Sequence, residues 1–184
     1  MAPCRAPAVV IRRAAEEMRR RGCSVTLFLQ GASGNLIHYD YARGGRGLSK
    51  EQVGTVLAAD AAGVIEHLTF RPTVALAGRS RVLRVPYHPV SEDDIRGTAR
   101  GAQRYIDSAI YDRMIPPLLE RMKHESGEDA EVQVLSMDEY AFAAIPAEYF
   151  VQNGLRIKER AYPRHALVVA YANGNLGYVP HAEA

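Results

Sequence analysis

The stretch VQVLSMDEYAFAAIPAEYFVQNGLRIKERAYPRHALVVAYANGNLGYVP, which runs from Val132 to Pro180, decides the fold. It opens with two β-rich apolar runs joined by Asp138-Glu139, which is the pattern of a β-hairpin. A helical segment and a third apolar run follow. The predicted elements are strands at 132–137 and 140–145, a helix at 148–160 and a strand at 167–170. This order is typical of an α/β protein, here with a mixed β-sheet layered with helices.

Two polar side chains follow the ends of these strands. Glu148 lies in Ile145-Pro146-Ala147-Glu148, and Tyr178 lies in the turn-rich segment after the last strand. Strand ends on one edge of a sheet are where α/β proteins build their sites, so both are candidate site residues. A second interpretation stays open for each. An acidic residue is favoured in the first turn of a helix, and a tyrosine beside a turn glycine can simply cover the core.

The upstream part of the chain predicts alternating helices and strands. Ser49 and Gln52 form a capping box at one helix start, and Ser91 followed by acidic residues marks another. Gly22 is the stop signal of the first helix. The predicted elements are a helix at 9–21, a buried strand at 24–29, a helix at 49–68, paired strands at 73–77 and 81–87 around Gly78-Arg79-Ser80, and helical segments at 91–106 and 108–123, the latter bent or broken at Pro116-Pro117. With no repeat or linker between them, these elements predict a single α/β domain over residues 1–184.

A long glycine-rich segment follows the predicted strand at 24–29. Residues 30–48 contain five glycines, and such a loop lets backbone N–H groups approach a ligand closely. The other interpretation is a plain connection, although ordered loops of this length are more often functional. The segment is not a phosphate-binding P-loop, because no Gly-Lys-Ser/Thr follows. The candidate loop residues are Gly31, Ser33, Gly34, Asn35 and His38.

Composition excludes several function classes. The chain has 184 residues and a net charge of +2, with no basic stripe, so nucleic-acid binding is not expected. Cys4 and Cys23 fit no metal-binding spacing, and a disulfide between them stays open. No apolar run reaches the length of a membrane span, and no signal peptide follows Met1, so a soluble chain without an export signal is expected.

The order of these motifs resembles the neutral/alkaline (non-lysosomal) ceramidase family, especially its shorter bacterial relatives. The family has a strand followed by a loop that reads like FLQGAAGD, which corresponds to Phe28–Asn35 here. It has Pro-Gly-Glu at a helix start, which corresponds to Pro146-Ala147-Glu148. It also has an Asn-containing strand end followed by Gly-Tyr-x-Pro, which corresponds to Asn173–Pro180. The resemblance extends from about Ser24 to Pro180.

The resemblance implies a zinc-dependent amidohydrolase of sphingolipid metabolism that cleaves an N-acyl linkage of the ceramide type. Glu148 and Tyr178 match the glutamate and tyrosine that hold zinc in the family. A lipid amide or another small molecule would be the substrate. Many family members are exported.

Several positions depart from the family pattern. Asn35 replaces the loop aspartate, Ile37 stands at the position of the nucleophilic serine, and His38 replaces a proline. The two histidine ligands of the family come from a region before Ser24, where this chain has no histidine. We therefore expect a partial ceramidase-like domain, truncated at both ends relative to the family, that binds zinc weakly or not at all and is inactive alone. Two alternatives stay open: a non-catalytic ligand-binding relative or decayed gene fragment, and a family hydrolase with a non-lipid substrate.

Overall fold

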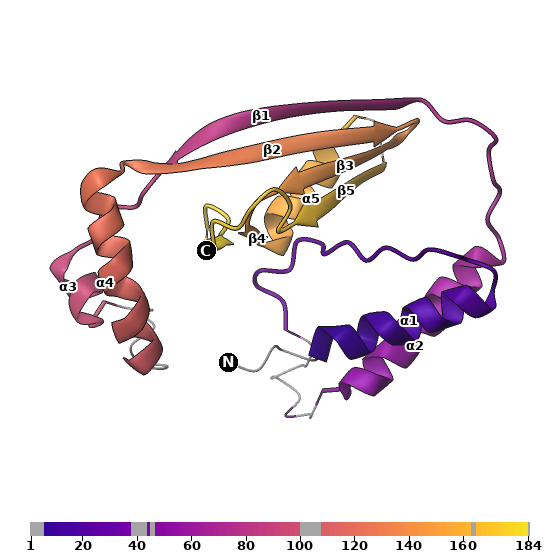
Figure 1. Cartoon of the computed structure of the whole chain (residues 1–184), viewed down its shortest axis with the longest axis horizontal. Helices are drawn as coiled ribbons and strands as arrows, with labels where there is room; N and C mark the ends of the chain where they lie inside the picture. Colours follow the sequence, from indigo (N-terminus) through magenta and orange to yellow (C-terminus); the bar gives the residue numbers. More distant parts are fainter. Residues whose placement is uncertain (1–5, 38–43, 45–46, 100–107, 163–164, 184) are drawn as a thin grey trace.

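A mixed four-stranded sheet and two separate groups of helices make up the computed structural model, which describes residues 6–37, 44, 47–99, 108–162 and 165–183 (Figure 1). The predicted mixed α/β class with a mixed sheet is confirmed at this level. In chain order the elements are α1 (Ala6–Arg20), α2 (Lys50–Ile65), β1 (Leu76–Pro86), α3 (Glu92–Arg96), α4 (Ser108–His124), β2 (Gly127–Met137), β3 (Tyr140–Ile145), β4 (Glu148–Tyr149), α5 (Val151–Arg160), β5 (His165–Ala170) and β6 (Tyr178–Val179).

The main sheet has the strand order β1-β2-β3-β5. The predicted hairpin is confirmed: β2 and β3 are antiparallel, with Met137 opposite Tyr140 and Asp138 in the turn at φ 52°. β3 and β5 are parallel, because the chain crosses over through α5 between them. A second, two-stranded sheet pairs β4 with β6 in parallel.

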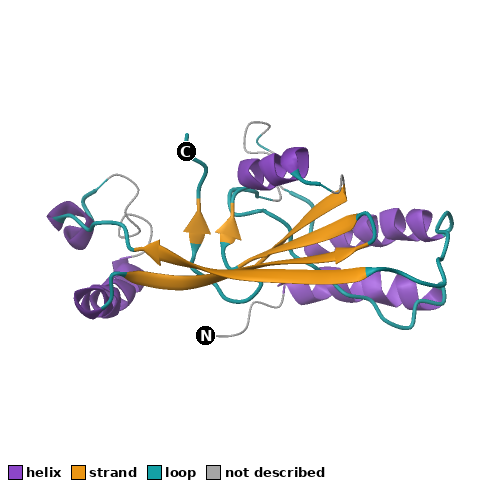
Figure 2. Ribbon diagram, turned by 90° about the horizontal axis from the view of Figure 1, so that it is seen from above, coloured by secondary structure: helices purple, strands orange, loops and turns teal. Residues whose placement is uncertain are grey.

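The prediction of two strands around Gly78-Arg79-Ser80 was wrong. Residues 76–86 form one continuous strand in which every residue, Gly78 included, faces a residue of β2. A single glycine does not turn a strand when a long partner is available to continue the ladder. That partner lies about fifty residues further along the chain, so no local pattern could reveal it. Figure 2 shows β1 and β2 extending as a two-stranded ribbon beyond β3 and β5 toward α3 and α4.

The α1 and α2 helices form a hairpin with close backbone contact. The predicted capping box of α2 is confirmed, with Ser49 Oγ accepting from the Gln52 backbone at 3.2 Å. Gly54, Ala58 and Ala62 are buried at every fourth position and face α1. A Cβ on Gly54 would lie 3.1 Å from Val10 Cα. Small residues at this spacing bring the helix axes together.

Two of the predicted helices differ in extent. The segment from Ser91 forms only one short helix, α3, because Gly97 adopts φ 70° and ends it. The rest of the predicted 91–106 helix reaches residues outside those described. α4 continues through Pro116 and Pro117, so the pair does not divide it. Each proline removes one backbone hydrogen bond, and the turns on both sides are kept.

The predicted buried strand at 24–29 is neither a strand nor buried in this structure. Val25 is 73% exposed and Leu27 is 82% exposed, and the segment has no ladder partner. Its apolar side chains are therefore not packed in a core.

The core is made mainly of small side chains. The buried apolar residues of the sheet and its neighbours are Ala130, Ala141, Ala147, Ala166, Val168 and Ala170. The accessible surface is 14085 Å², whereas a compact protein of 20.3 kDa has about 8,800 Å². The chain is therefore extended, and much of its apolar surface is uncovered. No helix in the described part is both long enough and apolar enough to cross a membrane.

Candidate functional site

The small β4–β6 sheet joins the end of β3 to the segment that follows β5. Glu148 lies directly opposite Tyr178, and the Glu148 N–H donates to the Gly177 carbonyl at 2.8 Å. Just before this pair in both segments, the Leu176 N–H donates to the Pro146 carbonyl at 2.8 Å. Backbone hydrogen bonds therefore fix both candidate residues on one edge. The two strand ends, which the sequence analysis placed on one edge of a sheet, do pair in this structure.

The sequence predicted that Glu148 lies in the first turn of a helix, and this prediction is wrong. Glu148 belongs to β4, and α5 begins only at Val151, after Phe150 at the N-cap position. The backbone N–H of Glu148 is already used by the Gly177 carbonyl, so the chain stays extended here. A favourable position in the first turn of a helix therefore does not explain this carboxylate.

Two phenol groups face the Glu148 carboxylate. A hydrogen bond from the Tyr178 hydroxyl to this carboxylate, with the nearby negative charge, raises the pKa of Tyr178. Partial desolvation raises the pKa of Tyr171, and a hydrogen bond to Glu148 adds to the effect. Both phenols thus stay protonated at neutral pH and act as hydrogen-bond donors. Tyr171 was missed by the sequence reasoning, because nothing in a strand-end tyrosine distinguishes it from a core-covering residue.

The backbone after β5 adopts left-handed conformations at several positions. Tyr171 has φ 57° and Asn173 has φ 65°, and Gly177 has φ 83°. Asparagine and glycine tolerate this region, but a bulky aromatic residue adopts it rarely and with strain. The Tyr171 N–H donates to the Ala147 carbonyl at 3.3 Å, which holds the strained residue beside β4. Backbone strain of this kind concentrates at functional sites.

The glycine-rich loop lies against β4, as expected of a candidate site loop. The Gly34 N–H donates to the Tyr149 carbonyl at 2.9 Å. A Cβ on Gly34 would lie 2.5 Å from the Glu148 carbonyl oxygen, so only glycine permits this approach. Gly31 has open space around its Cα, with no atom within 4 Å of an added Cβ.

The polar side chains of the loop are occupied elsewhere. Asn35 Oδ1 accepts from the Val151 backbone at 2.9 Å and so caps the start of α5. Asn35 Nδ2 donates to Gln152 Oε1 at 2.8 Å, and Ser33 Oγ accepts from Gln30 Nε2 at 2.7 Å. The backbone of the loop therefore lies at the site, whereas the Asn35 and Ser33 side chains form hydrogen bonds within the loop and with α5. His38 lies outside the described residues.

The aromatic ring of Phe150 packs beside the site. It meets the Tyr178 ring edge-on, with centroids 6.4 Å apart, and lies at the same centroid distance from His181. His181 Nδ1 is buried and has no hydrogen-bond partner in the described part of the chain. Sequence reasoning had passed over both residues, since neither belongs to a recognisable motif.

The donor set does not complete a zinc site within the described residues. Glu148 and Tyr178 offer two oxygen atoms, whereas zinc sites in proteins are usually four-coordinate and include nitrogen or sulfur donors. No group of three or more histidine, cysteine, aspartate or glutamate side chains gathers around one point in the described ranges. The pair alone therefore does not fit a zinc ion.

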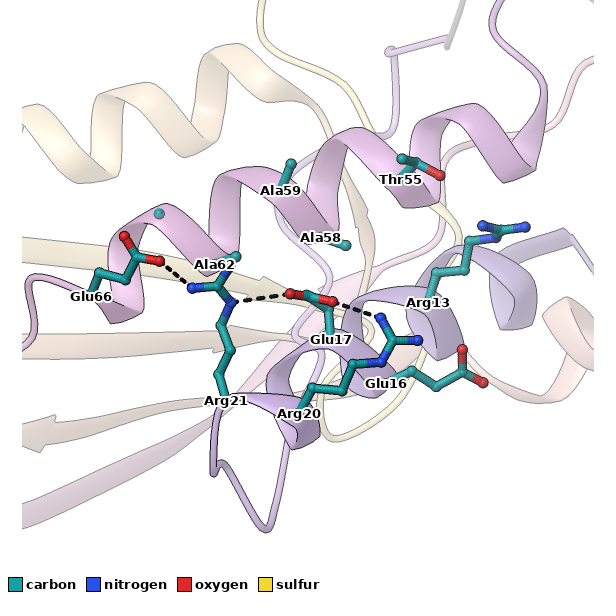
Figure 3. Close-up of a pocket in the computed structure, with 11 residues that line it drawn as sticks. Arg13, Glu16, Glu17, Arg20, Arg21, Thr55, Ala58, Ala59, Ala62 and Glu66 are labelled. Atoms are coloured by element: carbon teal, nitrogen blue, oxygen red, sulfur yellow. Dashed lines mark hydrogen bonds and ion pairs between the residues drawn. The ribbon is translucent and has the colours of Figure 1, made fainter.

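A cavity of about 480 Å³ lies elsewhere, between α1 and α2 (Figure 3). Four of its charged residues, Glu17, Arg20, Arg21 and Glu66, pair with one another. Arg21 bridges Glu17 and Glu66, and hydrogen bonds from Arg21 and Arg20 lower the pKa of Glu17. Since these charges are mutually satisfied, we interpret the group as a clasp between the two helices and place the candidate site at Glu148.

Neither a family model, nor a curated protein, nor a solved structure matches this chain.

Proposed function

We propose that the chain is part of a ceramidase-like hydrolase of N-acyl linkages, with its site at Glu148, Tyr178 and Tyr171. The observation that carries the proposal is the placement of a carboxylate opposite Tyr178 in the β4–β6 sheet. The motif order from Phe28 to Pro180 supports the substrate class, which is a fatty amide or a similar small molecule.

These residues can hold and move a proton. The Glu148 carboxylate can accept a proton from water as that water attacks an amide carbonyl, and can pass it to the amine nitrogen as the C–N bond breaks. A protonated phenol that turns its single O–H away from Glu148 can donate instead to the oxygen on which negative charge develops. The same carboxylate and phenol oxygens would be half of a metal site if nitrogen donors came from elsewhere, and no catalytic step is assigned to a metal.

The test is an assay of amide hydrolysis on a short-chain N-acyl sphingoid base, made with a parent protein that supplies the two histidine ligands, with and without added zinc. Glu148→Gln and Tyr178→Phe should each reduce the rate by about 100-fold or more, the usual range for a general base or an oxyanion donor. Glu92→Gln, an exposed substitution in α3, is the matched control. Hydrolysis that persists unchanged in Glu148→Gln would show that the site is wrongly placed.

A second candidate is a relative that binds the amide without cleaving it. Ile37 stands at the nucleophile position of the family, and the nearby Ser33 hydroxyl is bonded to Gln30. In that case the wild-type chain binds a fluorescent N-acyl amine and releases no fatty acid. Glu148→Gln then weakens binding without any change in product.

A further inference from the structure

The outer edge of β5 carries buried backbone donors that lack acceptors. β5 is the last strand of the order β1-β2-β3-β5, and the Ala170 N–H points away from β3, to the Gln30 carbonyl at 2.8 Å. Donor direction alternates along a strand, so the N–H groups of Ala166 and Val168 point the same way. Both residues are 7% exposed, and neither N–H donates to a backbone acceptor among the described residues. Unpaired buried N–H groups are costly.

An unpartnered strand-like segment lies just beyond this edge. Residues 24–29, SVTLFL, have the composition of a buried strand, yet Val25, Leu27, Phe28 and Leu29 are all exposed. Figure 1 shows the segment running in the same direction as β5. Leu29 already lines a cavity of about 260 Å³ together with β5 and α5 residues, among them Leu155 and Val168.

We propose that residues 24–30 dock in parallel on the outer edge of β5 and add a fifth strand to the sheet. The existing bond from Ala170 to Gln30 fixes the register, because a parallel strand receives its bonds at alternate residues. It places Gly31 opposite Ala170, and Leu29 opposite Val168. The Val168 N–H then donates to the Phe28 carbonyl, and the Ala166 N–H donates to the Thr26 carbonyl.

Side-chain direction agrees with this register. Residues opposite each other share a face of the sheet, so Leu29 falls on the side of Val168. That side is covered by α5, since a Cβ on Gly154 would lie 3.9 Å from Val168 Cγ2. Docking therefore moves Leu29 into the cavity beneath α5. It gives the two orphan donors their acceptors and removes apolar side chains from water, both of which favour the paired state.

The first test is amide hydrogen exchange on the full-length chain. The amides of Ala166 and Val168 should exchange about 100-fold or more slowly than unstructured amides. Phe28→Pro removes the donor to the Ala166 carbonyl and should abolish that protection. Val74→Pro, in the other extended connection, should leave it intact. Rapid exchange of both amides in the wild-type chain would overturn the proposal.

The second test is disulfide formation in a background of Cys4→Ser and Cys23→Ser. Phe28→Cys combined with Leu167→Cys should form an intramolecular disulfide on mild oxidation, since paired strands bring Cα atoms about 5 Å apart. The control pair, Leu27→Cys with Leu167→Cys, places the thiols on opposite faces and should remain reduced. A covalent dimer as the main product, or equal yields from both pairs, contradicts docking within one chain. The result is independent of the proposed hydrolase function, because neither pair touches Glu148 or Tyr178.

Discussion

Glu148 and Tyr178 are direct cross-strand neighbours in the β4–β6 sheet, although thirty positions separate them in the chain. The Glu148 carboxylate raises the pKa of Tyr178 through hydrogen bonding and its negative charge. Burial raises the pKa of Tyr171, which is held in a left-handed backbone conformation, and the same carboxylate adds to the effect. The site can therefore be tested by titrating the two tyrosines and by measuring the unfolding of variants at the residues that support it.

The first prediction concerns alkaline pH. The folded-state pKa values of Tyr178 and Tyr171 lie above the value of about 10 in an unfolded chain. Their contribution to the free energy of unfolding is therefore complete below about pH 10 and is lost as pH rises through the folded pKa. Glu148→Gln should move both phenol titrations down toward pH 10, as measured by tyrosinate absorbance.

The same variant should lose less stability than the wild-type chain between neutral and alkaline pH. Glu92→Gln, in the exposed first turn of α3, is the control and should leave the titration unchanged. Identical tyrosinate curves for wild type and Glu148→Gln would show that the carboxylate does not face the phenols.

The second prediction concerns the close approach of the loop to β4. Gly34→Ala places a Cβ 2.5 Å from the Glu148 carbonyl oxygen, so the backbone must shift. We expect a loss of about 1–3 kcal/mol in the free energy of unfolding, the usual cost of overpacking. Gly31→Ala, in the same loop with nothing within 4 Å, should be neutral or slightly stabilising. Denaturant unfolding of the two variants checks this contrast, and equal effects would contradict it.

The third prediction concerns the cap that the loop supplies to α5. Asn35→Ala removes the acceptor of the Val151 N–H and should cost about 1 kcal/mol of unfolding free energy. Asn35→Asp keeps an acceptor oxygen and adds a negative charge at the helix N-terminus, so it should retain most of the stability. Denaturant unfolding would measure both. If aspartate proves as harmful as alanine, the Asn35 side chain acts in some way other than capping.

The fourth prediction compares two glycines inside helices. In α5, Gly154→Ala would put a Cβ 2.6 Å from Ala32 Cβ and should destabilise the chain by about 1–3 kcal/mol. In α2, Gly63→Ala meets nothing within 4 Å and should stabilise the helix by up to about 1 kcal/mol. Thermal unfolding should therefore show midpoint shifts of opposite sign. Shifts of the same sign would mean that α5 does not pack on the loop as described.

Local sequence patterns predicted the parts of the fold that depend on neighbouring residues. The capping box at Ser49, the stop at Gly22 and the Asp138-Glu139 hairpin each involve contacts within a few positions. The error at Gly78 has the opposite origin, because the strand continues only when β2 is present to pair with it. The same reason explains Glu148, whose strand conformation depends on Gly177.

The candidate site was predicted in part. The turn-rich ends of two strands indicated that Glu148 and Tyr178 would meet, and they do. Tyr171 and the capping role of Asn35 were not predictable, since a left-handed tyrosine and a cap from a distant loop leave no mark in the sequence. The apolar run at 24–29 predicts a strand that this structure leaves unpaired.

The sequence by itself determined the class of the fold, the hairpin at Asp138-Glu139 and the capped helix starts at Ser49 and Ser91, because hydrophobic period and capping residues act over a few positions. Only the tertiary structure decided that β1 is one strand, that Glu148 is extended, and that one carboxylate faces two phenols. Those features depend on hydrogen bonds between segments that are tens of residues apart. The free energy of such a pairing depends on both segments, so the sequence of one segment alone does not determine it.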